Sequence, residues 1–151
     1  MYTVEATTQE HIEELAVTMR EEDIREVWAM SHSSPLESLN NSVEISAEPL
    51  TGLVDGKVIC IFGVVEPSIL STTGIPWLLG SDLVADHSKI FLKMNKVFID
   101  TIKQRYSLLT NYVDNRNKVS MAWLRWLGFK LHKPAPYGPD RMLFRKFEFR
   151  S

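Results

Sequence analysis

One stretch of the sequence, residues 108–129, constrains the fold more than any other, because it predicts a strand, a helix and a second strand in immediate succession. Residues 108–113 are apolar and β-branched, which is typical of a buried strand. Asp114, Asn115 and Asn117 follow, and their side chains can accept hydrogen bonds from the free N–H groups at a helix start. A helix is therefore expected directly after Asn117.

That helix has one wide apolar stripe and a defined end. Its apolar residues recur at helical spacing: Val119, Ala122, Trp123, Trp126 and Leu127. We expect this stripe, with both tryptophans, to be buried against a sheet. Gly128 ends the helix, because glycine enters the left-handed conformation without a steric cost, and Phe129 begins the next strand. Taken alone, the pattern predicts an ordinary core helix between strands.

The spacing within this stretch also resembles a family motif. Ser120 lies three residues after Asn117, Leu124 lies seven after it, and Gly128-Phe129 lies eleven and twelve after it. This spacing is similar to the second signature segment of the GNAT, or N-acetyltransferase, superfamily, whose pattern is Asn-x-x-Ala-x-x-x-Tyr-x-x-x-Gly-Phe. Because one fold can host many activities, the resemblance bears on the fold before it bears on the chemistry.

The first third of the chain predicts one strand followed by two or three short helices. An alternating strand pattern opens the sequence, and Thr7 with Glu10 has the spacing of a capping box. Residues 34–37, Ser-Pro-Leu-Glu, form a second helix start with proline at the first helical position. The acidic residues on these helices are interpreted as a solvated face.

A β-hairpin is the clearest feature of the middle of the chain. Asp55-Gly56 separates two apolar runs, residues 50–54 and 57–65, and this arrangement is the strongest short-range hairpin signal. Residues 68–73 are expected to form a loop or a short continuation of the sheet.

The rest of the chain supplies further strands around one long helix. Residues 75–81 predict a strand, and residues 88–106 predict the longest helix. The final strand is expected over residues 142–150, with a bulge where its alternation slips near Arg145-Lys146.

This order of elements is that of the GNAT fold. The resemblance implies an α+β architecture, with a central, mostly antiparallel mixed sheet flanked by helices. A single GNAT-like domain over residues 1–151 is expected, since a chain of this length can bury roughly two-thirds of its unfolded surface in one core.

The resemblance implies a place for acetyl-CoA, where two neighbouring strands splay apart. In the family a glycine-rich loop at the start of the long helix holds the pyrophosphate, because free N–H groups and the helix dipole favour an anion. The corresponding residues here are 79–88, in which Gly80 is the one glycine and Asp82 and Asp86 would repel phosphate. His87 could touch a phosphate, although a surface or cap role is commoner. The cofactor-binding candidates are Leu79, Gly80, Ser81, His87, Asn117 and Ser120.

The catalytic residues that the family implies are only partly present. GNAT enzymes often protonate the leaving thiolate with a tyrosine seven residues after the motif asparagine, and here that residue is Leu124. Tyr112 is the substitute candidate, and spacing does not separate it from Tyr106 or Tyr137. Glu66, at a strand end, could act as a general base through water, or could simply face solvent. The histidines lack metal-ligand spacing and no nucleophile motif is present, so no metal site is expected.

One branch of the superfamily resembles the chain more closely, namely the small GNAT-like proteins of tailed bacteriophages, including the internal virion protein A of short-tailed phages. The shared features are an aromatic strand ending in Ser81-Asp82, a long basic helix ending in Tyr106, an Asn-Tyr-Val strand at 111–113, and Leu124 in the second segment. The resemblance implies a phage origin, a protein partner in virion assembly or in the host, and a location in the host cytoplasm or the virion.

Composition and charge exclude several other classes. The net charge of −2 argues against nucleic-acid binding through bulk charge. Cys60 is the one cysteine, so an internal disulfide is impossible and a reducing, cytosolic setting is expected. No apolar run approaches the ~20 residues of a membrane span, and the first residues do not form a signal peptide.

Two functions stay open after this reading. The first is a GNAT-fold protein with a degenerate acetyl-CoA site, which acts through protein contacts and needs no cofactor. The second is an active, divergent N-acetyltransferase that uses acetyl-CoA on a small-molecule or protein amine.

Overall fold

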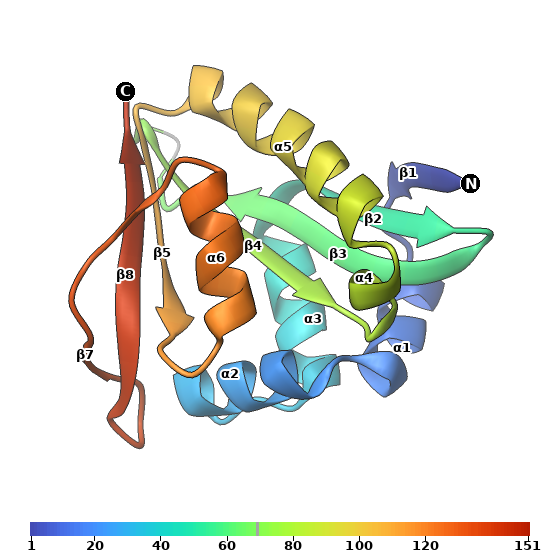
Figure 1. Cartoon of the computed structure of the whole chain (residues 1–151), viewed down its shortest axis with the longest axis horizontal. Coiled ribbons are helices and arrows are strands. Elements are labelled where there is room, and N and C mark those ends of the chain that lie inside the picture. Colours follow the sequence, from blue (N-terminus) through green and yellow to red (C-terminus); the bar gives the residue numbers. More distant parts are fainter. Residues whose placement is uncertain (69) are drawn as a thin grey trace.

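The computed structural model describes residues 1–68 and 70–151, and its centre is one mixed β-sheet (Figure 1). The strand order is β1-β2-β3-β4-β5-β8-β6, with β7 also paired to β8. Among the described strands, β4 and β5 run parallel and the other neighbours run antiparallel. The strands are β1 (Tyr2–Ala6), β2 (Ser46–Val54), β3 (Lys57–Val65), β4 (Thr73–Gly80), β5 (Leu108–Asp114), β6 (Lys130–Leu131), β7 (Ala135–Tyr137) and β8 (Met142–Arg150).

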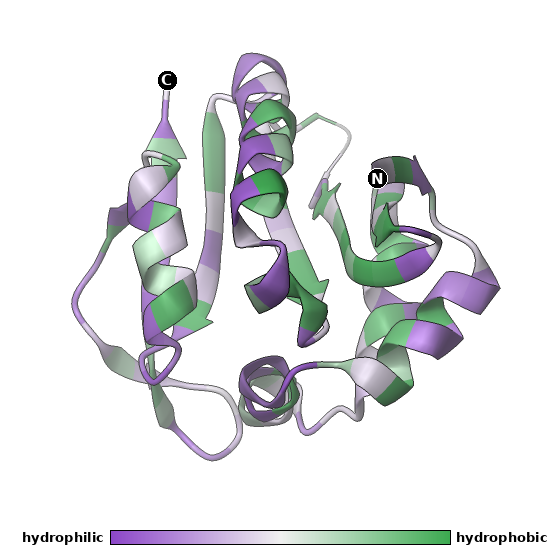
Figure 2. Ribbon diagram, turned by 45° about the vertical axis from the view of Figure 1, so that its right-hand side comes forward, coloured by the Kyte–Doolittle hydropathy of each residue, from purple (hydrophilic) through white to green (hydrophobic). Residues whose placement is uncertain are grey.

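Helices cover both faces of this sheet. Helices α1 and α3 pack on one face and α5 and α6 on the other, while α2 lies across the lower ends of β4 and β5 (Figure 1). The central strands are largely hydrophobic, whereas the helices carry both hydrophobic and hydrophilic residues (Figure 2). The helices are α1 (Gln9–Thr18), α2 (Glu21–Ser31), α3 (Pro35–Ile45), α4 (Leu83–Asp86), α5 (Ser88–Arg105) and α6 (Lys118–Trp126). The expected α+β architecture is therefore confirmed.

The β2–β3 hairpin forms where the sequence predicts it. Asp55 and Gly56 have φ angles of 50° and 81°, the two positive values that a two-residue turn of this kind requires. Of the next segment, expected to be a loop or a continuation of the sheet, residue 69 lies outside the described residues. Residues 70–72 lie outside any strand, and β4 begins at Thr73.

The feature that positions the site is the divergence of β4 and β5. Within the described residues these strands pair at two positions, Thr73 with Leu108 and Gly74 with Leu109. Beyond them the strands separate, and each keeps its outer neighbour, β3 or β8. The sheet is thus joined at one end and open at the other.

Of the two capping boxes predicted from the sequence, one is confirmed and the other is displaced. The box at Ser34 and Glu37 is confirmed, with Pro35 at the first helical position. The box at Thr7 and Glu10 is wrong by one residue, because Thr8 caps α1 and the ring of His11 accepts the reciprocal bond from the Thr8 N–H. An imidazole nitrogen here replaces the carboxylate that the sequence pattern favours.

The predicted inner face of α6 is partly wrong. Trp126 is 55% exposed and Val119 50% exposed, whereas the buried face carries Met121 and Leu127. Trp123 is half-buried and packs against Phe91, with ring centroids 5.1 Å apart. Helix α6 is apolar around most of its circumference, so periodicity alone could not choose the buried side.

The predicted bulge in the last strand is also wrong. Strand β8 pairs with β5 without interruption, from Asp114 opposite Phe144 to Leu108 opposite Arg150. The register shifts lie instead in β2, between Ala47 and Leu50 and again after Gly52. None of the described helices is long and apolar enough to cross a bilayer.

Candidate functional site

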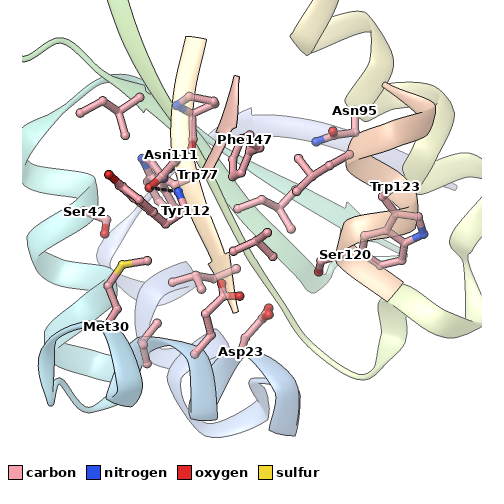
Figure 3. A pocket seen from close by; sticks show the side chains of 18 of the residues that line it. Asp23, Met30, Ser42, Trp77, Asn95, Asn111, Tyr112, Ser120, Trp123 and Phe147 are labelled. Carbon is pink, nitrogen blue, oxygen red and sulfur yellow. Dashed lines mark hydrogen bonds between the residues drawn. The ribbon is translucent and has the colours of Figure 1, made fainter. Parts of the chain in front are cut away.

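A cavity of about 330 Å³ occupies the space between the diverging strands (Figure 3). Its walls come from β4, β5, α2, α3, α5 and α6, with single residues from β3 and β8, and most of them are apolar. Trp77 and Leu79 face it from β4, Tyr112 from β5, and Trp123 and Leu124 from α6. Enclosed apolar clefts with a few polar groups are the usual form of a small-ligand site.

Asn111 ties the two strands together inside the cleft. Its side-chain Nδ2 donates to the Pro76 carbonyl at 2.8 Å, drawn as a dashed line in Figure 3. Proline has no N–H group, so this position of β4 offers an acceptor alone. The bond crosses from β5 to β4 just beyond the last paired residues and limits how far the strands open.

Two carboxylates of α2 close the open end of the cleft. Asp23 Oδ2 accepts from the Gly80 N–H at the end of β4, at 2.8 Å. Glu26 Oε1 accepts from the Asp114 N–H at the end of β5, at 2.9 Å, and lies 3.5 Å from Asn117 Nδ2. Helix α2 thus supplies hydrogen-bond acceptors to backbone donors that the divergence leaves without a strand partner.

Arg20, just before α2, links this closure to α6. Its Nη2 donates to Ser120 Oγ at 2.8 Å, and its Nε lies 2.9 Å from Asp23 Oδ2. The guanidinium lies 5.1 Å from the ring centroid of Trp123, and the Arg20 backbone N–H donates to the Gly80 carbonyl at 2.9 Å. Arg20 and Asp23 are both buried, so each charge depends on the other for compensation.

The carboxyl groups here have unusual acidities. Burial and, to a smaller extent, the nearby charge of Asp23 raise the pKa of Glu26 to about 7. Burial also raises the pKa of Asp23, although the Arg20 guanidinium opposes the shift. Asp114 differs: burial would raise its pKa, but the hydrogen bonds and charge of Arg116 outweigh burial and lower it. Glu26 is therefore a carboxyl at the cleft whose pKa lies near neutral pH.

The segment expected to hold a pyrophosphate forms the short helix α4. Several of its backbone N–H groups bond within the protein: Gly80 to Asp23, Ser81 to Ile59, Leu83 and Val84 to Ser81, Ala85 to Asp82, and His87 to Leu83. A Cβ atom at Gly80 would lie 2.8 Å from Val84 Cγ2, so glycine serves close packing of α4 against the strand. Asp82 and Asp86 are both exposed.

Of the residues predicted from sequence to bind cofactor, the structure brings some to the cavity and not others. Leu79 and Ser120 line it. Gly80 and Ser81 are buried at the end of β4, and Ser81 Oγ accepts from the Leu83 N–H. His87 precedes α5. Asn117 is buried beneath the cavity, where its Oδ1 accepts from the Ser120 N–H as the cap of α6.

Of the two candidate catalytic residues, Tyr112 lines the cavity and Glu66 does not. Tyr112 lines the cavity and stacks on Tyr137, with ring centroids 4.1 Å apart. Glu66 lies beyond β3 at the joined end of the sheet, where it accepts from the Tyr106 hydroxyl and lies 3.7 Å from Arg105 Nη2. Glu66 and Tyr112 therefore do not share a site.

Sequence reasoning missed the polar residues that do share the site, namely Arg20, Asp23, Glu26 and Asn111. The acidic residues of α2 match a solvated helix face in their local pattern, and nothing local marks Asp23 as buried or Glu26 as part of the cavity wall. In the described ranges, no three His, Cys, Asp or Glu side chains are grouped closely enough to hold a metal ion.

No protein-family model and no curated protein sequence matches the chain. Solved structures do match it in shape. A GNAT-family acetyltransferase from Streptococcus pneumoniae superposes with a TM-score of 0.69 at 10% identity, with 99% of each chain covered. The ribosomal-protein-S18-alanine N-acetyltransferase from Escherichia coli gives 0.66 at 15% identity, covering 99% of this chain and 94% of that one.

A third match was solved with its cofactor. The structure of yncA from Salmonella typhimurium, with acetyl-CoA, gives a TM-score of 0.68 at 12% identity and covers 99% of this chain and 93% of that one. At such low identities the likeness concerns the backbone arrangement. The diverging strands, the helices on both faces and these superpositions together show that the chain has the fold of the GNAT acetyltransferases.

Proposed function

We propose that this chain is a GNAT-fold protein that acts through contacts with other proteins and does not transfer acetyl groups. The observation that carries the proposal is the short helix α4. It uses, for internal hydrogen bonds, backbone N–H groups at the place where the family resemblance puts the pyrophosphate.

The physical argument concerns what an anion needs. Pyrophosphate is held by several free N–H groups that converge on one point, with glycine to let the backbone come close. Here the Val84 side chain packs closely against Gly80, and the Gly80 N–H donates to Asp23 Oδ2. Asp82 and Asp86 add negative charge to the same segment. A bound cofactor would have to unfold α4 or meet two carboxylates.

We further propose that the chain comes from a tailed phage and serves in virion assembly, in the virion or the host cytoplasm. The sequence features shared with the phage branch support this, among them Ser81-Asp82 and Leu124. Leu124 lies in the cavity wall among apolar side chains and has no proton to give. Proteomic analysis of purified virions of the encoding phage should detect the chain, and its absence from them would count against the assembly role.

Acetyl-CoA binding tests the central proposal. A ligand that binds the folded state alone stabilises it by about 2.7 kcal/mol at a hundredfold excess over Kd, which raises Tm by several degrees. We expect no such shift with millimolar acetyl-CoA. A double variant, Asp82→Ser with Asp86→Ser, removes the repulsion and keeps the internal bonds, so it should also show little gain. A clear shift in the unmodified chain would overturn the proposal.

One observation favours the second candidate, an active and divergent N-acetyltransferase. Glu26 borders the cavity and has a pKa of about 7, which suits a group that accepts a proton from an amine at neutral pH. If the chain transfers acetyl groups to an amine, Glu26→Gln should lower kcat and leave the binding of acetyl-CoA unchanged. Equal activity in this variant would remove Glu26 from the reaction.

A further inference from the structure

The outer surfaces of the two helical layers carry opposite charge. On α1, α2 and α3, which the structure describes in full, Arg25 is the one exposed basic residue. The exposed acids of this acidic layer are Glu10, Glu13, Glu14, Glu21, Glu37 and Glu44. On α5 and α6, the one acid, Asp100, is half-buried and paired with Lys96 at 2.7 Å. The exposed bases of this basic layer are Lys89, Lys93, Lys96, Arg105, Lys118 and Arg125.

Each layer also exposes large apolar side chains among its charges. Val17, Trp28 and Ile45 are more than half exposed on the acidic layer. Val97 and Trp126 are more than half exposed on the basic layer. A mixture of exposed aromatic and aliphatic side chains with charge of one sign is typical of a protein-binding surface.

We propose that the chain associates with itself head to tail, the acidic layer of one copy resting on the basic layer of the next. Helices α1 and α3 of the acidic layer lie on the face of the sheet opposite α5 and α6, and α2 lies across the lower ends of β4 and β5 (Figure 1). The two layers therefore face different directions, and one copy can engage two neighbours at once. The contact is heterologous, because two like layers would repel. Heterologous contacts build rings where the rotation closes and open filaments where it does not.

The choice of a second copy as the partner follows from charge complementarity. The same molecule carries one layer of each charge sign, with similar numbers of exposed charges and with exposed apolar side chains on both layers. The net charge of −2 is therefore small because the charges of the acidic layer and the basic layer largely cancel. The charged residues named for both layers do not line the cavity, so the association is expected whether or not acetyl-CoA binds.

Sedimentation velocity at several protein concentrations and two salt concentrations gives the first test. Screening shortens the range of exposed charges from ~30 Å at 0.01 M salt to ~3 Å at 1 M salt. We expect species larger than a dimer at low salt and high protein concentration, and their dissociation at high salt. A monomer under all these conditions would overturn the proposal.

Charge reversal tests which surfaces meet. A basic-layer variant (Lys89→Glu, Lys93→Glu, Arg125→Glu) and an acidic-layer variant (Glu10→Lys, Glu13→Lys, Glu44→Lys) should each stay monomeric at low salt. An equimolar mixture of the two should associate again, because each then presents one surface that matches the other. A mixture that stays monomeric would overturn the head-to-tail arrangement.

Two further variants guard against general effects of charge and of folding. A matched control (Lys57→Glu, Lys130→Glu, Lys133→Glu) changes the net charge by the same amount as the basic-layer variant, at exposed positions outside both layers. It should associate as the unmodified chain does. Trp126→Ala should weaken association while circular dichroism and Tm stay nearly unchanged, because the side chain is mostly exposed. Binding of a monomeric chain to anionic phospholipid vesicles would instead assign the basic layer to a membrane surface.

Discussion

The two helices that begin beside the cleft, α5 and α6, start in very different ways. Helix α6 begins at a filled cap, where Asn117 accepts from the Ser120 N–H and lies within reach of Glu26. Helix α5 follows α4 directly, and His87 makes no side-chain cap bond among the described residues. The family-like spacing at α6 therefore has a structural explanation that requires no cofactor. Before α5, where the family resemblance places the pyrophosphate, several backbone N–H groups of residues 80–87 donate to acceptors within the protein.

Disrupting the closure by α2 should have the largest effect on stability. Asp23→Ala leaves the buried Arg20 guanidinium uncompensated and removes the acceptor for the Gly80 N–H. Loss of one partner of a buried ion pair costs about 3–5 kcal/mol of unfolding free energy. Chemical denaturation should show a loss of this order. The double variant Arg20→Met with Asp23→Leu should recover part of it, and a loss below about 1 kcal/mol in Asp23→Ala would contradict the closure.

One added methyl group at Gly80, at the end of β4, should lower the free energy of unfolding. Gly80→Ala places a Cβ atom 2.8 Å from Val84 Cγ2, which α4 can relieve only by moving. Overpacking of this kind costs about 1–3 kcal/mol. Because the clash is with one side chain, the same substitution should cost less in a Val84→Ala background. Equal costs in the two backgrounds would mean that Gly80 is needed for another reason.

Removing the cap of α6 should lower the free energy of unfolding by less than the substitution at Gly80. Asn117→Ala removes an N-cap, which costs about 0.5–2 kcal/mol. Thr8→Ala, which removes the exposed cap of α1, is the matched comparison. Asn117 is buried and also approaches Glu26, so we expect the larger loss at Asn117 when both are measured by urea denaturation. A larger loss at Thr8 would show that the contact with Glu26 adds nothing.

The smallest expected effect is a change in pH dependence. The folded-state pKa of Glu26 is raised to about 7 from an ordinary value of 4.5, so the folded chain binds more protons than the unfolded chain between these values. Its contribution to the free energy of unfolding is therefore greatest below the ordinary value and falls as pH rises toward 7. Glu26→Gln keeps an acceptor oxygen and should flatten this part of the stability curve. An unchanged slope between pH 5 and 7 would place Glu26 in a more solvated environment.

Local signals explain what the sequence could predict. The Asp55-Gly56 turn, the cap at Asn117 and the stop at Gly128, whose φ is 96°, each depend on a few neighbouring residues. The order of such elements resembles that of the GNAT family, and this resemblance supplied the prediction of the mixed sheet. Helix α4 was missed because four residues give no readable period.

The site itself depends on contacts between distant residues, and these left no local mark. Glu26 meets Asp114 across 88 positions of the chain, and Arg20 meets Ser120 across 100. The exposure of Trp126 likewise depends on which side of a largely apolar helix meets the sheet. In such cases tertiary packing decides between alternatives that the local sequence leaves equal.

The divergence of β4 and β5 has a consequence for motion as well as for the cavity. Within the described residues, β4 and β5 pair at Thr73 and Gly74, which joins one half of the sheet, β1 to β4, to the other, β5 to β8. At the same end, the Thr72 carbonyl accepts from the N–H groups of Ser107 and Leu108. Opening at this seam breaks few hydrogen bonds, so the two halves should exchange their amide protons with solvent as separate cooperative units. At the far end, Asp23 and Glu26 of α2 accept hydrogen bonds from β4 and β5. We therefore expect the exchange rate of the two halves to change with the protonation of Glu26.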